Sequence, residues 1–355
     1  MGISLPLICA FLFQNSIKLP LAISKKSNSL NELRQSSMLL KPNSLLNIAS
    51  IVDFLSIWVV IFGIIIIAGF YDNLALYIAV SIVIGGRFRA LEELAHFSMH
   101  NALFTSRKFG RSMADLVSQF PLFNPPTAFW TSFHCAQHHP NVGTEEDPAF
   151  SSLLDAGFKQ GMTSGEFWSC LLTPLSVSGV IQTLKYALEG FDPRKNQYSV
   201  IVLRITSILF IYCSIATLVG FKPLLLCVLP ALLLWLPLFS WISLICEHNW
   251  FEQANDNLNT ISKEIKLGKR THFAGLSGLF FKALIFPVGD TYHLTHSILP
   301  SLHFRFLPWA NKILESTYPE YMEAQHTSGF WIRNKNGSKG SLSFIYDKAA
   351  SSIKL

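Results

Sequence analysis

The chain has 355 residues, of which 50% are hydrophobic and only 14% are charged, and its mean hydropathy is positive. This balance excludes an ordinary soluble domain and predicts a membrane protein. We interpret the formal net charge of +6 as a topology signal and an attraction to anionic headgroups, not as a nucleic-acid footprint.

Residues 1–46 precede the first apolar span and are expected to form an N-terminal cytoplasmic or interfacial segment. The apolar run ISLPLICAFLF in this segment is short, and no basic residue precedes it, so it lacks the charge order of a cleaved signal peptide. We expect it to lie in the membrane interface or to dock on the protein.

Four stretches reach about the 20 apolar residues that a bilayer requires, and they lie at about 51–70, 74–95, 198–220 and 223–245. Very short loops join them into two hairpins. Arg87, Arg89 and Arg204 fall within these spans, so we expect them near span ends or facing protein. The sequence therefore predicts an all-α fold, a four-span transmembrane helical bundle whose cap is also helical.

Lys and Arg are unevenly distributed among the connections, because the two short loops contain only Lys222. Basic residues before the first span and between the hairpins are Lys25, Lys26, Arg34, Lys41, Arg107, Lys108, Arg111, Lys159, Lys185, Arg194 and Lys195. By the positive-inside rule, both termini and the cap are expected to be cytoplasmic. We expect residues 47–308 to form the membrane domain and residues 309–355 a C-terminal cytoplasmic tail. Two further apolar stretches, 167–191 and 273–288, are too broken or too short to cross and are expected at the interface.

Eight of the eleven histidines lie in four short segments. They are His96 and His100, then His134, His138 and His139, then His248, then His293 and His296. Histidines three or four residues apart on a helix share one face, close enough to bind one metal or adjoining metals.

Two of these segments follow long spans. His96 lies 22 residues beyond Leu74 and His248 lies 25 beyond Pro223, so both reach roughly 33 to 37 Å along their helices. That length matches one bilayer, so sequence-distant histidines are expected to converge at one membrane surface. Zinc usually takes four ligands, so this number of histidines fits two metals, and imidazole ligation is compatible with iron, copper or nickel.

The motifs around these histidines resemble a known family. HFSMH resembles a first histidine box, HCAQHH followed by PNVGTEEDP a second, CEH an additional histidine, and GDTYHLTHSILPSLHFRFLP a third box. In this order, on four spans, they resemble the integral-membrane fatty acid desaturase and hydroxylase superfamily from about residue 51 to residue 308.

The resemblance implies a non-haem centre of two iron ions that uses dioxygen and two electrons to oxidise an unactivated C–H bond. The implied metal ligands are His96, His100, His134, His138, His139, His248, His293 and His296. A fatty acyl desaturase is the first expectation. A hydroxylase or ketolase of the same superfamily, acting on a carotenoid, an alkane or another apolar molecule, is the alternative.

One position departs from the pattern, because the third box ordinarily ends in two adjacent histidines and here the second is Ser297. The change leaves one metal a ligand short, or leaves a position for water or substrate. His303 is a possible substitute ligand, because Pro300 should break the helix between them.

Metal-bound imidazoles need acceptors for their second ring N–H, and Asn141, Asp147 and Glu247 are the candidates. An acyl pocket is expected from the helices around Phe97, Phe120, Phe123 and Trp130 and from the 235–241 section of the fourth span, although plain lipid-facing packing is the alternative for each.

Neither a Cys-rich iron–sulfur pattern nor a Gly-rich dinucleotide fingerprint is present in the sequence. We therefore expect a separate electron donor, such as ferredoxin or a cytochrome, and an apolar substrate within the membrane. Two rival interpretations stay open. A metal transporter predicts ionisable residues near mid-bilayer, whereas a catalytically inactive scaffold predicts no bound metal.

Overall fold

The computed structural model describes residues 29–38, 42–252, 258–331 and 338–351. The apolar run ISLPLICAFLF lies outside these residues. Four helices are long and apolar enough to cross a membrane: Ser44–Tyr71 (α3), Leu74–Met99 (α4), Tyr198–Val219 (α11) and the continuous helix Phe221–Glu247. The predicted helical membrane bundle is confirmed. The first helix begins several residues before the expected span, and the second continues through the first histidine box.

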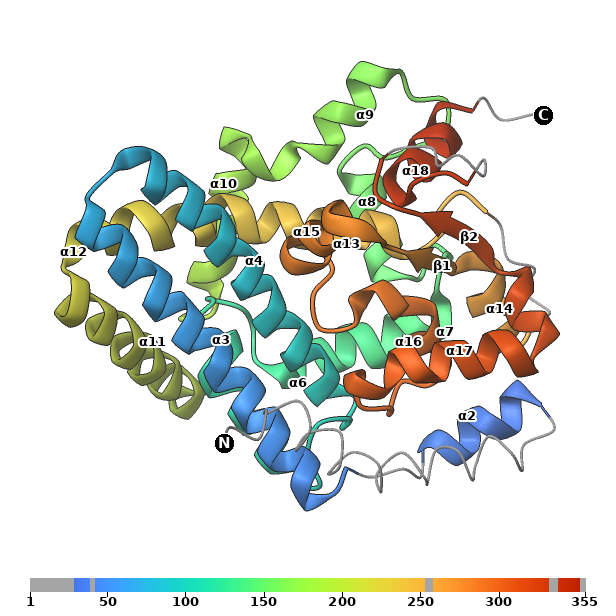
Figure 1. The fold of residues 1–355 in the computed structure, drawn as a ribbon, viewed down its shortest axis with the longest axis horizontal. Coiled ribbons are helices and arrows are strands. Elements are labelled where there is room, and N and C mark those ends of the chain that lie inside the picture. The colour runs from blue at the N-terminus through green and yellow to red at the C-terminus, as the bar shows by residue number, and fades with distance from the viewer. Residues whose placement is uncertain (1–28, 39–41, 253–257, 332–337, 352–355) are drawn as a thin grey trace, which may run out of the picture.

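Short polar residues set the turn between the first two spans. The side chain of Asn73 accepts a hydrogen bond from the Leu76 backbone N–H at 3.1 Å and so caps α4. Asp72 ends α3 in the left-handed region, with φ of 43°. The two helices are therefore antiparallel neighbours, and α4 also contacts the fourth span and α15 (Figure 1).

The fourth span is a composite helix because it contains three prolines. It consists of α12 (Phe221–Pro223), the π-helical segments η4 (Leu224–Val228) and η5 (Ala231–Trp235), and α13 (Leu236–Glu247). Pro223, Pro230 and Pro237 each remove a backbone donor, so the hydrogen bonding widens locally to the i→i+5 pattern.

Two glycines bring α4 close to its neighbours. A Cβ on Gly85 would lie 2.4 Å from Cβ of Trp235 on the fourth span. A Cβ on Gly86 would lie 2.8 Å from Cα of Leu284 on α15. Neither position has room for a side chain, so the Gly85–Gly86 pair allows both helices to pack directly on the α4 backbone.

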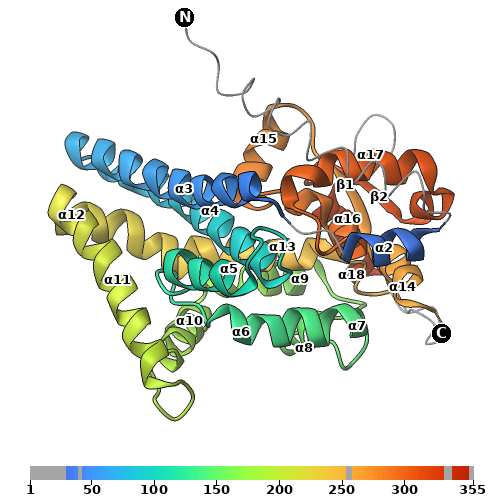
Figure 2. The same cartoon turned by 90° about the horizontal axis from the view of Figure 1, so that it is seen from below.

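Short helices make up the cap and the connection between the hairpins. They are α2 (Leu30–Met38), α5 (Arg107–Ala114), η1 (Asp115–Gln119), α6 (Thr127–Trp130), η2 (Thr131–His138), α7 (His139–Asn141), α8 (Pro148–Asp155), α9 (Ser164–Leu171), η3 (Thr173–Leu175), α10 (Val177–Glu189), α14 (Thr260–Leu267), α15 (Gly275–Leu284), η6 (Asp290–Tyr292), α16 (His293–Ile298), η7 (Phe304–Phe306), α17 (Leu307–Thr317), η8 (Pro319–Glu323) and α18 (Ser341–Ala350). Figure 2 shows the spans at one end of the molecule and most of these elements at the other.

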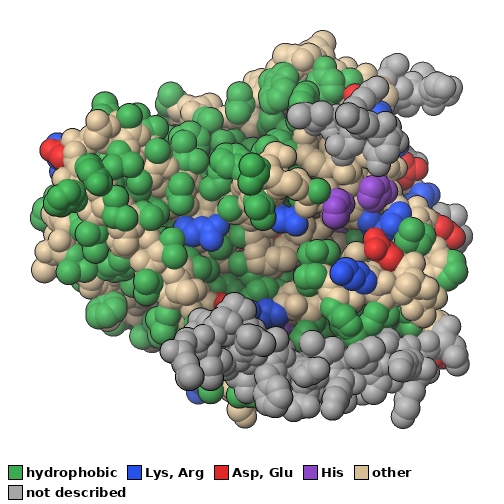
Figure 3. All heavy atoms as spheres, viewed as in Figure 1, with side chains coloured by type: hydrophobic (Ala, Val, Ile, Leu, Met, Phe, Trp, Pro, Cys, Tyr) green, Lys and Arg blue, Asp and Glu red, His purple; other side chains and the backbone are tan. Residues whose placement is uncertain are grey.

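The two apolar stretches expected at the interface form short helices. The first comprises α9, η3 and α10, where Val177 is 77% exposed, and the second contains α15, where Leu276 is 86% exposed. None of these helices is long enough to cross a bilayer. Hydrophobic side chains are concentrated over the spans, and charged and histidine side chains over the cap (Figure 3).

The segment expected as a C-terminal tail folds back onto the cap. Strand β2 (Gln325–Ser328) pairs in parallel with β1 (Lys269–His272), with Lys269 opposite Gln325. Helix α18 contacts α13, and its Leu342 and Ile345 side chains are buried. Because these apolar side chains are buried, α18 is part of the hydrophobic core and not an exposed tail.

Candidate metal centre

Two groups of metal-ligating side chains lie in the cap, and within each group the ligand atoms are all within 4.8 Å of one another. The first group contains His96, His100, His134 and His296. The second group contains His138, Glu247, His248 and His293. Four segments that are far apart in the sequence therefore meet, as the histidine spacing predicted.

The local structure explains how each segment delivers its side chains. His96 lies in the last turn of α4, and His100 caps that helix. The second box lies on the π-helix η2, where the His139 backbone N–H donates to the His134 carbonyl. This wider turn places His134 in the first group and His139 beside it, while the intervening His138 belongs to the second.

Several imidazole nitrogens face one another directly. Nε2 of His96 lies 2.8 Å from Nε2 of His134 and 3.1 Å from Nε2 of His296. Nε2 of His96 carries at most one proton, so it can donate to only one of these two nitrogens. The remaining nitrogen lone pairs therefore converge on a common point. In the second group, Nε2 of His293 lies 3.2 Å from Nε2 of His248. Convergent imidazole lone pairs are the arrangement that a transition metal requires.

Further ring nitrogens are buried without a hydrogen-bond partner among the described residues. They include Nε2 of His138 and Nε2 of His139. His139 lies outside both four-residue groups, but its ring centroid is 4.5 Å from that of His134 and 5.1 Å from that of His100. A buried nitrogen without a partner is costly unless it has a ligand, so this donor set fits bound metal.

Carboxylates hold the opposite side of three imidazoles. Nδ1 of His138 lies 2.8 Å from Asp147, Nδ1 of His139 lies 3.3 Å from Glu264, and Nδ1 of His96 lies 3.2 Å from Glu93. Asp147 also accepts backbone N–H groups from Gly143 and Ala149, at 3.0 and 2.9 Å, so its position is fixed. Each carboxylate orients its imidazole with Nε2 directed inward.

Burial lowers the pKa of most of these imidazoles, and the neighbouring imidazoles lower it further. The pKa lies well below the ordinary value for His100, His134, His248, His293 and His296. Burial likewise lowers the pKa of His138, but its hydrogen bond and charge interaction with Asp147 reverse the direction and raise it. The five strongly shifted imidazoles are neutral at physiological pH, as metal binding requires.

An ionic network fixes the base of the site. Arg89 of α4 is buried and pairs with Glu93 one turn along the same helix and with Asp290 at 3.1 Å. Ser243 of α13 donates to Asp290 at 2.7 Å. The network therefore ties α4 and α13 to the segment that precedes His293, and Arg89 faces protein as expected.

The structure places two of the three predicted acceptors, Glu247 and Asn141, differently from the expectation. Glu247 lies within the second group, not behind it, and its carboxylate is 3.9 Å from Nε2 of His293. The Asn141 side chain donates to the Gln137 carbonyl at 2.9 Å, so it serves its own helical turn and not a histidine. Asp147 is where an acceptor for His138 was expected.

His303 does not replace the missing histidine of the third box. Its Nε2 lies 3.1 Å from the Ser50 hydroxyl, and its Nδ1 accepts the Arg305 backbone N–H at 3.3 Å. The expectation of a substitute ligand is therefore wrong for this structure, because helix α16 ends at Ile298 and the chain then leaves the site. Ser297 itself is fully buried beside His296, and its hydroxyl has no partner among the described residues.

Sequence reasoning missed Glu264 and Lys269. Glu264 lies on α14 with Ile261 and Ile265, all three buried, so a carboxylate on the apolar face of that helix was the available signal. Lys269 is 2% exposed, its Nζ has no hydrogen-bond partner among the described residues and lies over the Phe344 ring, and it is near Glu247. Burial lowers the pKa of Lys269 to about 8.

Comparison with protein families agrees with this geometry. Residues 72–329, well over half of the chain, match the family model described as fatty acid desaturase. The chain belongs to the fatty acid desaturase family. Comparison with curated proteins gives no match. Membership in this family supports an oxidoreductase of the desaturase and hydroxylase type, with histidine groups that are compatible with it.

A large apolar cavity of this desaturase-family chain lies between α10 and the fourth span, with a volume of about 930 Å³. Phe123 and Trp241 line it, as expected for an acyl pocket, together with Leu233 and Leu236. Phe97 lies elsewhere, against the His296 ring at a centroid distance of 4.9 Å.

The cavity reaches Glu92, which precedes His96 by one helical turn on α4. The two Glu92 oxygens accept hydrogen bonds from Asn124 and Ser240, at 2.7 and 2.5 Å. The carboxylate is therefore satisfied by protein groups where it meets the apolar space.

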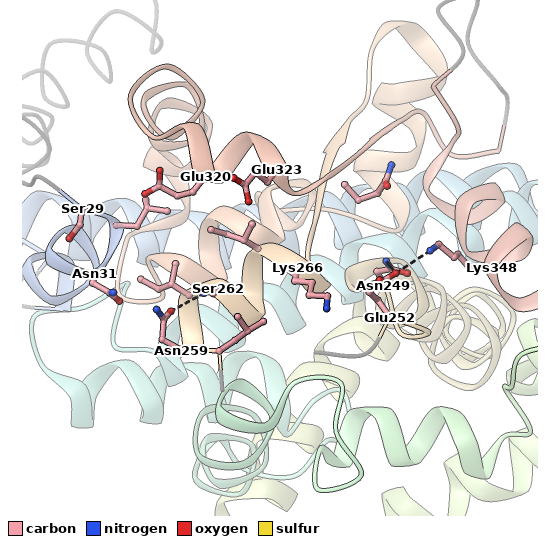
Figure 4. A pocket seen from close by; sticks show the side chains of 15 residues that line it. Ser29, Asn31, Asn249, Glu252, Asn259, Ser262, Lys266, Glu320, Glu323 and Lys348 are labelled. Carbon is pink, nitrogen blue, oxygen red and sulfur yellow. Dashed lines mark hydrogen bonds and ion pairs between the residues drawn. The ribbon is translucent and has the colours of Figure 1, made fainter. Parts of the chain in front are cut away.

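A second, polar cavity of about 620 Å³ lies on the side of the cap, among α2, α14, η8 and α18. Figure 4 shows Lys348 meeting Glu252, at 3.1 Å, and the Asn259 side chain accepting from the Ser262 backbone N–H, at 2.9 Å. No histidine lines this cavity among the described residues, so it is separate from both ligand groups.

Proposed function

We propose that this desaturase-family chain is a membrane oxygenase with two iron ions, and that its reaction is the desaturation of a fatty acyl chain. The reaction would consume dioxygen, two electrons and two protons, remove two hydrogen atoms from adjacent methylenes and form two molecules of water. The observation that carries the proposal is the pair of four-ligand groups, each with its ligand atoms within 4.8 Å, to each of which the second histidine box contributes one member.

The eight histidines implied by the family resemblance are the proposed ligands. His96, His100, His134, His139 and His296 would hold one ion, and His138, His248 and His293 the other. Glu247 would add a carboxylate to the second ion, so that this ion also has four protein ligands. Bound iron would supply the activation of dioxygen and the oxidation of the C–H bond.

The chain's own residues would orient the ligands and keep water out. Asp147, Glu264 and Glu93 accept the outward N–H groups of three imidazoles, which keeps Nε2 deprotonated and directed inward. The apolar cavity would hold the acyl chain and, through its Leu and Phe lining, exclude water from the methylenes.

Electrons would come from a separate carrier, such as ferredoxin or a cytochrome, at the histidine face of the membrane. The uneven distribution of Lys and Arg supports a cytoplasmic position for that face and for both termini. The substrate would approach from the membrane side, where α10 and the fourth span border the apolar cavity.

Product analysis tests the proposal against its alternative. The full chain, purified with bound metal and supplied with a ferredoxin system, dioxygen and acyl lipids, is expected to give products two mass units lighter by mass spectrometry. Products sixteen units heavier would assign a hydroxylase. Products fourteen units heavier would assign a ketolase, with a carotenoid or an alkane as further substrates to supply.

A pair of matched variants distinguishes the activity of this chain from that of host enzymes. His100→Ala removes a proposed ligand, whereas His272→Ala removes an exposed histidine of β1 that belongs to neither group. Product formation should vanish for His100→Ala and persist for His272→Ala. Equal activity in the two variants would contradict the proposal.

A further inference from the structure

A groove of about 380 Å³ lies between the first two spans and helix α15, away from both ligand groups. Its apolar lining comes from all three helices and from the chain that follows α15, and includes Ile57, Ala90, Leu94, Leu279, Val288 and Phe304. Two cations, Arg87 of α4 and Lys282 of α15, also line it. The groove therefore combines an apolar wall with positive charge.

The charges of the groove are not balanced by protein. Asp53 is the acidic residue of the lining, and Arg305 pairs with it from the cap. Arg87 donates to the Ala283 carbonyl, a neutral partner. Lys282 has no hydrogen-bond or ion-pair partner among the described residues. Two positive charges are thus left beside apolar side chains without a protein counter-ion.

Close packing fixes the backbone positions of both cations relative to each other. The C-terminal end of α15 lies on Gly86, where a Cβ would be 2.8 Å from Cα of Leu284 and 3.0 Å from the Ala283 carbonyl oxygen. Arg87 follows Gly86 directly, and Lys282 lies two residues before Leu284. The contact that sets the α4–α15 distance therefore also places Arg87 and Lys282 along the same groove.

Exposed apolar side chains of α15 and α3 lie beside the groove. Leu276, Leu279 and Phe280 on α15 are 86%, 63% and 58% exposed, an apolar surface of the kind that lies against lipid in a membrane protein. Val52 and Val59 on α3 are also more than half exposed, at 53% and 70%. Cations at such a boundary are expected to bind anions, and a lipid headgroup is the anion that this surface offers.

We propose that this groove is a binding site for an anionic phospholipid of the leaflet on the histidine side. Arg87 and Lys282 would bind the phosphate, and the acyl chains would lie against the apolar walls of α3 and α15. Such a lipid would hold α15 against α4 independently of the substrate, and the site does not depend on the oxygenase proposal.

Native mass spectrometry of the full chain in detergent tests the proposal, with phosphatidylglycerol and phosphatidylcholine as the added lipids. One phosphatidylglycerol per chain is expected to bind at least tenfold more tightly than phosphatidylcholine. Removing one cation should weaken binding about fivefold, and removing both, in Arg87→Gln/Lys282→Gln, more than tenfold. Equal binding of the two lipids would overturn the site.

Controls separate the groove from general charge and from misfolding. Lys222→Gln removes a cation near the opposite end of the spans, where it pairs with Asp72, and should leave binding unchanged. Lys282→Gln alters a partly exposed side chain and is expected to fold, which its elution volume verifies. Unchanged lipid binding in Lys282→Gln, or equal loss in Lys222→Gln, would contradict the proposal. Competition by soluble glycerol phosphate as strong as by the lipid would also contradict it, since it would assign the groove to free phosphate.

Discussion

The two ligand groups use the same imidazole chemistry in different surroundings. The first group consists of imidazoles alone, and its His96 and His134 remain partly exposed. The second group includes the Glu247 carboxylate, and its three histidines are 1% to 6% exposed. The Trp250 ring packs against this second group, with its centroid 5.0 Å from that of His248.

This difference teaches how the site is assembled. The first group takes two members from the end of one long span, so α4 alone establishes half of it. The second takes its members from η2, the end of α13 and α16, and forms only when the cap is folded. An anionic ligand and deeper burial give the second group a more closed environment, so we expect the two metals to differ in affinity and reduction potential.

The largest effect is expected from removing one member of the second group. His138→Ala should reduce product formation at least a thousandfold. It should also reduce bound iron from about two ions per chain to about one, because the second group keeps three protein ligands whereas the first keeps all four. Membrane insertion should not change. Iron analysis and turnover of His138→Ala beside His272→Ala measure this, and full turnover in His138→Ala would refute the role.

The carboxylates behind the ligands should have the next largest effect. Asp147→Asn keeps the size of the side chain but weakens the acceptor of His138, and we expect a 10- to 100-fold loss of iron affinity. Glu264→Gln should cause a similar loss through His139. Glu145→Gln changes an exposed acid of the loop before Asp147 and serves as the control. Chelator titrations compare the three variants, and an unchanged affinity in Asp147→Asn would contradict the orienting role.

A smaller effect is expected when the asymmetric ligand itself is neutralised. Glu247→Gln removes one negative charge from the second group, which should weaken iron binding there about tenfold and raise its reduction potential. Potentiometric titration monitored by Mössbauer spectroscopy distinguishes the two ions. If the substitution changes the reduction potentials of both ions equally, the two ligand groups do not provide distinct environments.

His303 can be compared with the ligand groups, because it is a buried histidine that belongs to neither of them. Its pKa is lowered to about 3 by burial and by Arg305, whereas an unfolded histidine has a pKa of about 6.5. Below pH 6.5 the unfolded chain binds the proton first, so stability falls with pH by roughly 1.4 kcal/mol per unit down to about pH 3.

His303→Gln removes this titration. The loss of unfolding free energy between pH 7.5 and pH 5 should be about 2 kcal/mol smaller in the variant than in the parent chain, with unchanged turnover at pH 7.5. Thermal unfolding in detergent at the two pH values measures it, with the exposed His272→Gln as control. An acid sensitivity equal to that of the parent would contradict the assignment.

The long-range arrangement of the site was predictable because hydropathy and histidine spacing act together. A span of known rise per residue sets the height of His96 and His248, and the two hairpins then place both at one surface. The second box was harder, because α-helical spacing puts His134 and His138 on one face, yet they belong to different groups. The π-helical turn of η2 supplies the reason.

Other features were not predictable, because they depend on contacts between distant segments. Glu264 reaches His139 from a helix more than a hundred residues later, and no local pattern marks it beyond its place on an apolar face. The return of residues 325–331 and 338–350 to the cap depends on strand pairing with β1 and on the α13 surface, neither of which a polar tail sequence reveals. His303 had suitable chemistry but the wrong backbone path after Ile298.

Metal content per chain tests the central claim most directly. The full chain, expressed with iron in the medium and purified in detergent, should contain two iron ions per chain by mass spectrometry of the metal, and Mössbauer spectra should show two inequivalent sites. A chain that carries no transition metal, or that carries two ions still bound after His100 and His138 are both replaced by alanine, would contradict the account.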